Sequence, residues 1–506
     1  MALRHAGFPL LQLAILAICR IGEARILTSV IPYMPDMVEY VGVPKSDVPK
    51  WVGITATVTA TCAGSVGVIW GMISDYTGRK NVILFELLLM IAFTLLFGFS
   101  QSLAQLVSSR ALLGLVNGNI GILRTMVAEM VTEKQHQPRA FSVLPIAWTI
   151  GSGVGPVLGG ALVHPAQHYP KMFGDAELFI KYPFVLPNIV ATCCVAVAII
   201  VAFLFLQETQ AGRENRNDYG LTLGRMLWPS CTSRKVDAGD AHIDGDERAP
   251  LLDDDRAQAS EDPEQRLAGK PRWKEVFSVQ PSLILLTYGG MGMHTMAFDS
   301  LLPVLLHYPV QQLHGNPDVQ LPFKFNSGFG LDSNQIGPFY TILAVSGVVF
   351  QSVVFPWVAQ RIGVLRSLRL SSILFPMLYL TVPFIPLIPS PLCNIGVGML
   401  LVFKQALSTC VFPCCTILLS HAAANLGILG TLNGMGTSIS AFGRALGPII
   451  IGSAFSFGVK QGYMIVPWWT LAGSALLTSL PVLWIVDSNE EEQQVDDNRE
   501  STSNTE

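Results

Sequence analysis

Acidic side chains stand inside long apolar stretches of this sequence. Glu23 follows Arg20 by three residues, so the two side chains share one face of a helix and can neutralise one another. Asp299 lies in a second apolar stretch, with no basic residue within one helical turn. Because an ionisable group near the centre of a bilayer costs about 2.5–3.5 kcal/mol, such residues are functional candidates. The chemistry that these carboxyl groups offer is reversible protonation.

Two influences compete on such a carboxyl group: burial favours its protonated form, and a nearby cation favours its carboxylate. For Glu23, there are two alternatives. Arg20 either forms a simple ion pair with the carboxylate, or it moves toward and away from the carboxylate, so that Glu23 releases and binds a proton. For Asp299, the lack of a local base favours burial as the dominant influence. We predict Glu23 and Asp299 as proton-coupling candidates, and the simple ion pair remains the alternative for Glu23.

Other ionisable residues also lie in apolar stretches. The cations are Arg110, Arg124 and Lys404. They either attract an anionic or carboxylate-bearing solute or serve as counter-ions to the acids, which are Glu23, Glu129 and Asp299. His294 is either a hydrogen-bonded packing residue or a proton relay. Arg444 precedes a Gly-Pro pair at 447–448 and is predicted to act as a latch between helices.

The elements that must position these residues are membrane helices. Half of the 506 residues are hydrophobic and 13% are charged, against about 25% charged in an average soluble domain. Blocks of about 20 apolar residues match the roughly 30 Å hydrocarbon core of a bilayer. We place twelve blocks at 9–31, 52–73, 81–100, 103–130, 141–163, 183–206, 281–306, 335–358, 368–388, 393–420, 428–457 and 465–486. The first block continues past any plausible cleavage site, so no signal peptide is expected.

Basic residues in the short loops predict the orientation, because Lys and Arg concentrate on the cytoplasmic side. They occur in alternate loops, at 79–80, 134–139 and 361–369. Both termini and the long middle loop are therefore predicted to be cytoplasmic. The predicted domains are an N-terminal six-helix half (1–206), a disordered linker (207–275), a C-terminal six-helix half (276–486) and an acidic disordered tail (487–506).

The linker contains a short motif that resembles a sorting signal. In "ERAPLL", Glu247 stands four residues before Leu251 and Leu252. This acidic dileucine form resembles sorting signals that direct membrane proteins to vacuoles or lysosomes through an adaptor. The predicted location is the vacuolar membrane, with the plasma membrane as the alternative.

Three short strings recur in the same order in the two halves. They are "TSVIP" (28–32) with "DSLLP" (299–303), "GMISDYTG" (71–78) with "PWVAQRIG" (356–363), and "GSGVGPVLGG" (151–160) with "FGRALGPIIIG" (442–452). The offsets of 271, 285 and 292 residues grow slowly. The order indicates a duplication of six spans in parallel orientation, as in secondary transporters. The fold class predicted is an all-α membrane protein with two pseudo-symmetric halves.

Glycines at four-residue spacing let helix backbones approach closely. The helix-packing motif consists of Gly151, Gly155, Pro156, Gly159 and Gly160. Simple packing explains it, and so does a contact that controls which way a cavity opens.

The sequences of these motifs resemble those of a known family. "GMISDYTGRK" (71–80) resembles the G-x-x-x-D-x-x-G-R-K loop of the major facilitator superfamily, and "SRALLGLVNGN" (109–119) its R-x-x-x-G pattern in span 4. "GSGVGPVLGG" resembles a pattern of the drug:proton antiporter branch. Other wording, around "GNIGILRTMVAEM", is similar to a fungal group related to zinc-induced-facilitator-like transporters.

The resemblance implies that spans 1, 4, 7 and 10 line a central cavity. It also implies a gate at the loop motif, in which Asp75 faces the cytoplasmic start of span 11. The gate residues are Gly71, Asp75, Gly78, Arg79 and Lys80. Two departures stand out: Tyr76 replaces the usual base after the acid, and Gln360 replaces the acid in the second copy.

The predicted function is secondary transport of a small organic solute across a bilayer, by proton-coupled antiport with alternating access. The alternative is a receptor or scaffold without transport that signals through the linker. No Walker loop or G-x-S-x-G elbow occurs, so an enzyme is not expected. No cofactor or bound metal is predicted, because no C-x-x-C pairs with another at zinc-site spacing and the loop histidines are scattered. No nucleic acid is predicted either, since the net charge of −4 comes from solvated ends and linkers.

Overall fold

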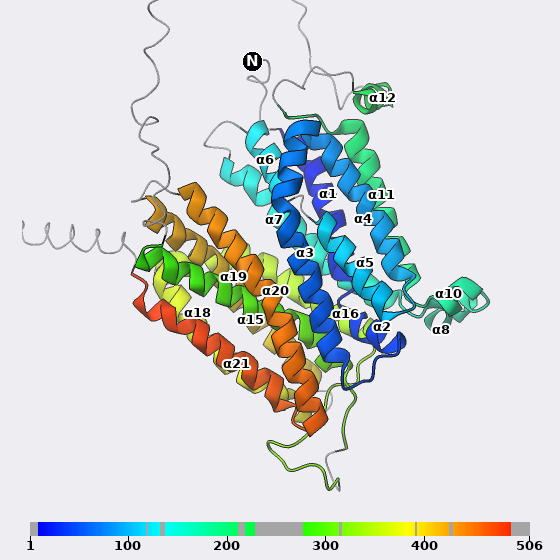
Figure 1. Ribbon diagram of the computed structural model, residues 1–506, viewed down its shortest axis with the longest axis vertical. Helices are drawn as coiled ribbons and strands as arrows, with labels where there is room; N and C mark the ends of the chain where they lie inside the picture. Colours follow the sequence, from blue (N-terminus) through cyan, green and yellow to red (C-terminus); the bar gives the residue numbers. More distant parts are fainter. Residues whose placement is uncertain are drawn as a thin grey trace, which may run out of the picture.

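The computed structural model is a bundle of long helices (Figure 1). The structure describes residues 9–117, 120–131, 137–210, 218–227, 277–312, 316–389, 392–424 and 429–486. In these ranges, the β-pairing consists of two isolated bridges, Gln320 with Lys324 and Phe325 with Tyr463.

The N-terminal half contains six long apolar segments and several short helices. Its helices are α1 (Leu10–Ser29), α2 (Met34–Tyr40), α3 (Val48–Thr77), α4 (Arg79–Gly98), α5 (Leu103–Val116), α6 (Ile120–Met130), α7 (Gln137–Ala161), α8 (Pro165–His168), α9 (Pro170–Phe173), α10 (Glu177–Lys181), α11 (Val185–Phe205) and α12 (Tyr219–Leu227).

The C-terminal half repeats this plan with more irregular turns. Its elements are α15 (Val279–His307), α16 (Ser333–Val349), the π-helix η2 (Phe350–Val354), α17 (Phe355–Ile362), α18 (Val364–Thr381), the 3₁₀-helix η3 (Val382–Leu387), α19 (Leu392–Ala424), α20 (Leu429–Gln461), α21 (Ile465–Ser479) and the 3₁₀-helix η4 (Leu480–Trp484).

Each of the twelve predicted blocks coincides with a long helix or with a run of abutting helices. Within the described residues, nine helical segments are long and apolar enough to cross a membrane. The other three blocks form α1, α3 and α15. The predicted all-α membrane fold is therefore confirmed.

One span changes helix type midway. Span 8 runs from α16 through the π-helix η2 into α17. Pro356 lies in the first turn of α17. Because proline has no backbone N–H and its ring clashes with the preceding turn, it displaces the regular hydrogen-bond ladder at this point.

The two halves repeat each other at the residues that the duplication pairs. Gly78 (φ 104°, ψ 148°) separates α3 from α4, and Gly363 (φ 90°, ψ 157°) separates α17 from α18 in the same conformation. Gly151 and Gly155 press against α1, and their counterparts 292 residues later, Gly443 and Gly447, press against α15. The predicted pseudo-symmetry is confirmed in backbone detail.

The halves touch through α3 with α20 and α7 with α16. Gly53 of α3 abuts the backbone of Pro448, and Gly160 of α7 abuts the backbone of Ser333. Figure 1 shows α3 and α20 side by side near one end of the bundle and diverging toward the end that carries α12. We call the latter the linker end and the former the opposite end.

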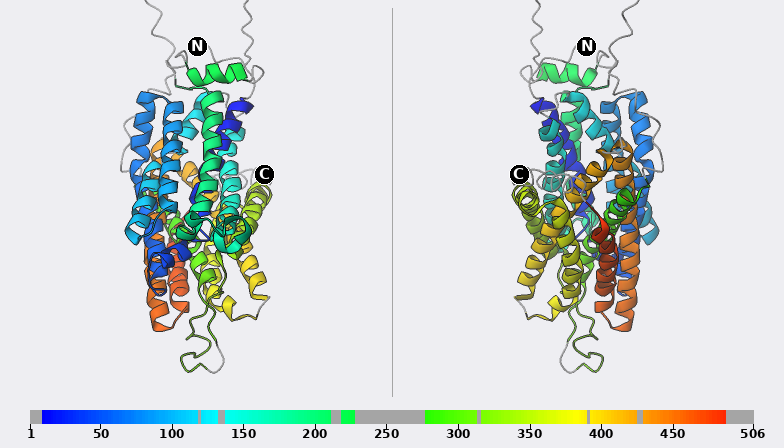
Figure 2. Two further views of the ribbon diagram at one scale, coloured as in Figure 1. Left: turned by 90° about the vertical axis from the view of Figure 1, so that its right-hand side faces the viewer. Right: turned by 90° about the vertical axis from the view of Figure 1, so that its left-hand side faces the viewer.

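The linker differs from its prediction at one stretch. Residues 219–227, expected to be disordered, form α12, which lies across the ends of the long helices (Figure 2). Its N-terminus is ordered by Asp218, whose carboxylate accepts a hydrogen bond from the Leu221 N–H at 3.1 Å. Residues 207–210 and 218 of the linker are also described, whereas 211–217 and 228–275, including the Glu247, Leu251 and Leu252 motif, lie outside the described residues, as does the tail.

Candidate functional site

An ion pair joins spans 7 and 10 in the C-terminal half. The Lys404 ammonium of α19 lies 2.6 Å from a carboxylate oxygen of Asp299 on α15. The Lys404 side chain is 3% exposed, whereas that of Asp299 is 42% exposed. The expectation that burial dominates at Asp299 is therefore wrong, because its base comes from another helix. The counter-ion interpretation of Lys404 matches this contact.

Aromatic side chains surround this pair. The Lys404 ammonium lies 5.5 Å from the centre of the Phe298 ring, which stacks on Tyr379. Tyr340 from α16 is also buried, and its hydroxyl has no hydrogen-bond partner among the described residues. Because low-polarity walls strengthen charge interactions, the ring of aromatics increases the attraction between Asp299 and Lys404.

His294 stands one turn and a half from Asp299, inside the half. It is fully buried, and its Nδ1 lies 2.9 Å from the Tyr379 hydroxyl while its Nε2 lies 3.0 Å from the Met291 sulfur. The ring also contacts Phe375 edge-on. These neighbours favour the packing interpretation of His294 over the proton relay.

A second pair is formed within α1. Arg20 Nη1 lies 2.7 Å from Glu23 Oε1, with side chains 8% and 0% exposed. The guanidinium also stacks on the Trp148 ring of α7, 4.3 Å from its centre. The simple ion pair is thus present, and the indole face holds the cation in place.

The two arginines of span 4 are separated. Arg110 of α5 lies 5.7 Å from the centre of the Phe97 ring, inside the N-terminal half. Arg124 of α6 is exposed. Glu129, one of the acids considered as their counter-ion, instead pairs with Arg79 at 3.3 Å.

Two charged residues escaped the selection of candidates. Glu86 of α4 is fully buried, and Arg25 of α1 is half-buried with its Nε enclosed. Both stand in apolar blocks, so the rule that selected Glu23 and Asp299 would have found them. Arg25 lies two residues after Glu23 on another face of the helix.

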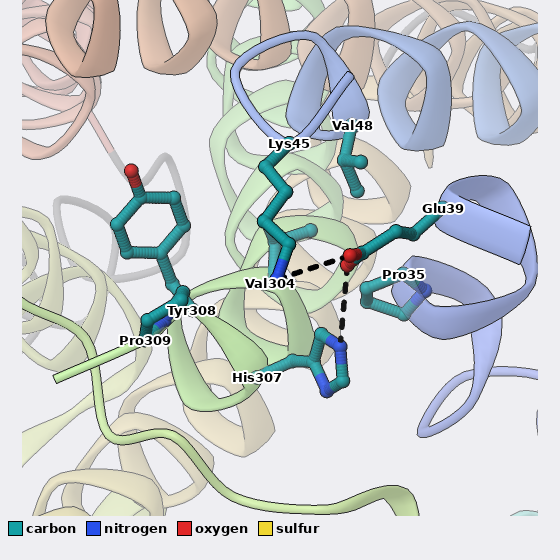
Figure 3. A pocket seen from close by; sticks show the side chains of 8 residues that line it. All are labelled: Pro35, Glu39, Lys45, Val48, Val304, His307, Tyr308 and Pro309. Atoms are coloured by element: carbon teal, nitrogen blue, oxygen red, sulfur yellow. Dashed lines mark ion pairs between the residues drawn. The ribbon is translucent and has the colours of Figure 1, made fainter. Parts of the chain in front are cut away.

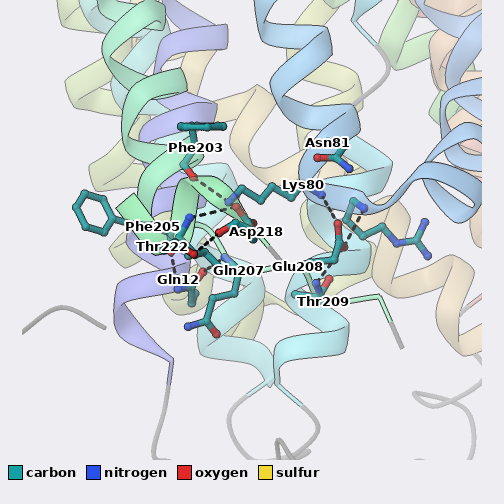
Figure 4. A network of polar contacts seen from close by, with 12 residues as sticks. Gln12, Lys80, Asn81, Phe203, Phe205, Gln207, Glu208, Thr209, Asp218 and Thr222 are labelled. Carbon is teal, nitrogen blue, oxygen red and sulfur yellow. Dashed lines mark hydrogen bonds and ion pairs between the residues drawn. The ribbon is translucent and has the colours of Figure 1, made fainter. Parts of the chain in front are cut away.

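The loop after span 2 is held by acids from outside its own motif. Glu208, three residues after α11, accepts hydrogen bonds from the backbone N–H groups of Arg79 at 2.9 Å and Lys80 at 3.1 Å (Figure 4). The same carboxylate accepts from the N–H groups of Thr209 and Gln210. A carboxylate at the start of α4 satisfies donors that a helix N-terminus leaves free, and it is favoured by the helix dipole.

Lys80 points in the other direction along the same loop. Its ammonium donates to Asp218 Oδ2 at 2.6 Å and to the Phe203 carbonyl at 2.8 Å, and its side chain is 4% exposed. Arg79 bonds the Ser74 hydroxyl as well as Glu129. The two basic residues of the motif thus tie α4 to α6, α11 and α12.

The other gate residues are placed as follows. Gly78 ends α3 at a positive φ, beside the Glu208 carboxylate, and Gly71 has open space around it. Asp75 belongs to α3, but its side chain lies outside the described residues. Its contact with the start of span 11 therefore remains a prediction.

The glycine motif of α7 faces two partners. Gly151, Gly155 and Gly159 meet the α1 backbone near Ile21, Arg25 and Ser29, where an added Cβ would overlap. Gly160 instead meets Ser333, and the Pro156 carbonyl meets Gly337, both on α16 of the other half. One helix thus packs tightly within its half and against the other half.

Arg444 lies on α20, and its Cγ packs close to Gly292 of α15. Both helices belong to the C-terminal half. The contact therefore joins two helices of one half and does not bridge the halves.

A small cavity of about 30 Å³ lies between the halves at the opposite end (Figure 3). Glu39 of α2 lies 3.1 Å from the Lys45 ammonium and 3.9 Å from His307 Nε2, and His307 ends α15. Asp47 and Lys460 form a further ion pair between the halves. Burial raises the pKa of the neighbouring Tyr308 hydroxyl, although the hydrogen bond from Asn326 and the charge of Lys45 act against this.

In the described ranges, no group of three or more His, Cys, Asp or Glu side chains is arranged to hold a metal ion. His164 is engaged with Asp36 at 2.8 Å, and His168 with the Val163 carbonyl at 2.7 Å. A second hollow, of about 410 Å³, is lined by residues of α16 and η2 between Thr341 and Phe350, none of them charged.

Charge pairs enclosed in two repeated bundles of apolar helices, joined at one end, are the features of a secondary membrane transporter. The sequence profile of the Major Facilitator Superfamily matches residues 13–448, and the chain belongs to this superfamily. It is 35% identical to the Major facilitator superfamily multidrug transporter mfsB of Aspergillus fumigatus, over 96% of this chain and 84% of that protein.

A more distant relative and a solved structure are also similar over most of the chain. Protein ZINC INDUCED FACILITATOR-LIKE 1 of Arabidopsis thaliana is 24% identical, over 91% of this chain and 87% of its own length. The crystal structure of the nucleoside transporter NupG has the same fold, with a TM-score of 0.60 and 12% identity over 93% of this chain and 98% of that one.

These findings confirm the family that the motifs indicated, including its multidrug and zinc-induced-facilitator-like relatives. The chain is an integral, multi-pass membrane transporter of a small molecule and not an enzyme. The alternative of a receptor or scaffold is not supported.

Proposed function

We propose that this transporter exchanges a small organic solute for protons by alternating access, and that Asp299 is the carboxylate that couples the two. The observation that carries the proposal is the asymmetry of the Asp299–Lys404 pair, in which the acid is 42% exposed and the base 3% exposed. A proton or a solute can therefore reach the acid, while the base stays behind it.

The pair offers a simple exchange. Protonation of Asp299 removes the partner of a buried ammonium, which then favours an anionic group in its place. A solute with a carboxylate would fill that place at Lys404, whereas a solute with a cation would compete with Lys404 for Asp299. For a cationic solute, the proton and the solute exclude each other at Asp299, which is the requirement of antiport. An anionic solute at Lys404 would instead bind together with the proton, so antiport favours the cationic solute.

Glu23 is the second coupling candidate. It is more enclosed than Asp299, and Arg20 is stacked on Trp148. Release of its proton would depend on Arg20 staying close, and uptake on Arg20 moving away. Arg110 and Arg124 lie on span 4 and are proposed to contribute positive potential without pairing with Glu23.

The test uses purified protein in liposomes with a pH gradient, solute uptake and internal pH being measured together. Asp299→Asn should stop pH-driven accumulation. It also leaves a buried cation unpaired, which costs about 3–5 kcal/mol, so the double variant Asp299→Asn with Lys404→Gln is needed. Asp175→Asn, an exposed acid in a loop, is the control.

The double variant should recover the yield of folded protein and retain exchange of solute without a gradient. It should not accumulate solute in response to pH. If it drives proton movement as well as the control does, Asp299 is not the coupling group. The corresponding variant Glu23→Gln then decides whether the second acid carries the role.

The loop motif is proposed to form the gate at the linker end. Asp75 would face the start of α20, where the positive end of the helix dipole favours a carboxylate by about 0.3–1 kcal/mol. Arg79 and Lys80 hold the loop against α6, α11 and α12, which keeps Asp75 at a constant depth. Arg444 is proposed to keep α20 and α15 moving together.

The membrane in which the transporter resides and the orientation of its termini are proposed from the sequence. We infer cytoplasmic termini from the basic loops, and a vacuolar membrane from Glu247, Leu251 and Leu252, with the plasma membrane as the alternative. Replacing both leucines with alanine in a fluorescently tagged chain should move it between these membranes if an adaptor reads the motif. Unchanged localisation would remove the adaptor from the proposal.

A further inference from the structure

Helix α12 exposes an apolar face that no described part of the chain covers. Tyr219, Leu223, Met226 and Leu227 are 85%, 48%, 76% and 65% exposed. At 100° per residue they fall within one arc of about 100°. Arg225, also exposed, points to the other side of the helix. A soluble linker helix would not keep four large apolar side chains in water.

Two glycines determine which face of α12 packs against the bundle. Gly220 and Gly224 are buried against the carbonyl oxygens of Phe203 and Leu204 in the last turn of α11. An added Cβ at either position would overlap these carbonyls. The glycines therefore let α12 lie directly on the end of α11, and they fix which face of α12 turns away from the bundle.

The position of this contact identifies what lies beside the apolar face. α11 is a membrane-spanning segment over Val185–Phe205, so its last turn marks the edge of the hydrocarbon. The exposed apolar side chains of α11, Val197, Ile200 and Phe203, lead along the helix to the same edge. Figure 2 shows α12 lying across the ends of the long helices. A helix at this depth with one apolar face lies in the plane of the bilayer surface.

We propose that α12 is an interfacial anchor that inserts Tyr219, Leu223, Met226 and Leu227 into the lipid at the linker end. The anchor is joined to the gate loop by an ion pair. Asp218 caps α12 through the Leu221 N–H and binds the buried Lys80 ammonium at 2.6 Å. Lipid contact at α12 therefore fixes the position of the first residues of α4. Because α12 is anchored, movement of the linker beyond it is not transmitted to the gate loop.

The proposal is tested with the full-length transporter in liposomes of phosphatidylcholine and phosphatidylglycerol. A spin label is placed at Leu223 or at Arg225, on opposite sides of one helix, in a chain without native cysteines. Oxygen, which concentrates in lipid, and a water-soluble nickel chelate relax the two labels. The label at 223 should be relaxed several-fold more by oxygen than the label at 225, with the reverse order for nickel.

Two results would overturn the proposal. Equal access of nickel to both labels would place α12 in water, and shielding of the 223 label from both agents would show that protein covers the face. The variant Asp218→Asn, which breaks the pair with Lys80, separates anchoring from folding. It should raise nickel access at 223 while the label at 225 is unchanged, whereas unfolding of α12 would equalise the two sites.

Discussion

The contact between α3 and α20 predicts that one methyl group will shift the conformational equilibrium. In Gly53→Ala, the new Cβ would stand 2.9 Å from the Pro448 carbonyl carbon and closer still to its oxygen. Ordinary Cβ contacts begin at about 3.4 Å, so the two helices must separate by roughly 0.5–1.2 Å to relieve the contacts with the carbonyl carbon and oxygen. Gly452 faces Gly53 across the same crossing, which leaves no flexible side chain to move aside.

The added methyl group raises the free energy of only one conformational state of the transporter. Overpacking of a close contact costs about 1–3 kcal/mol, which corresponds to about a 5- to 150-fold change in a population ratio. The contact joins the halves at the opposite end, so only a state closed at that end contains it. Gly53→Ala should therefore favour the state that is open there, without unfolding either half.

Distances between spin labels at Lys171 and Gln461, exposed sites near the opposite end of each half, report the shift. Gly64→Ala is the matched control, because it lies in the same helix with open space around it. Gly159→Ala overlaps α1 within one half, so it should lower stability without changing the distance. If Gly53→Ala gives the same distance distribution as Gly64→Ala, the reasoning fails.

Three further outcomes follow from the polar contacts. Glu208→Gln replaces one of the two acceptor oxygens with an NH2 group, so that, with the amide oxygen in the Oε1 position, the Lys80 N–H faces another donor. The change should lower the stability of the purified protein by about 1–3 kcal/mol in thermal unfolding, with exposed Glu177→Gln unchanged. His307→Gln removes the ring nitrogen that lies 3.9 Å from the Glu39 carboxylate across the boundary between the halves, so it should lengthen the label distance. An unchanged distance would exclude a role for this contact in holding the halves together. Because burial raises the pKa of Tyr308, the folded chain keeps its proton where the unfolded chain loses it, and stability should fall above about pH 10. Tyr308→Phe should reduce that fall in an alkaline melting series.

Features set by local chemistry were predictable from the sequence. The twelve blocks were found because a helix that crosses lipid needs an apolar run of fixed length. The spacing of the repeated strings pairs Gly78 with Gly363, and both positions have a positive φ, which glycine adopts without strain. The family followed from motifs of the same kind.

Features set by tertiary contact were not predictable. The base of Asp299 lies 105 residues away on another helix, so no spacing along one helix could reveal it. Glu208 and Asp218 act on the gate loop from beyond α11, in a segment whose polar composition indicated disorder. Helix α12 is only nine residues long, and its order comes from a cap and two glycine contacts that depend on α11.

The two ends of the bundle are linked by the same pair of helices, and this constrains the role of Asp75. Helix α3 carries Gly53 near the opposite end and Asp75 near the linker end, and α20 carries Pro448 and its own start at the corresponding ends. If α3 and α20 rock about one another, the Gly53 contact and the proposed Asp75 contact belong to different states. Asp75→Asn should then increase the population of the state that is closed at the opposite end, whereas Gly53→Ala decreases it. The double variant should return the label distances toward those of the native chain. Additive shifts in one direction would show that Asp75 does not act as the gate at the linker end.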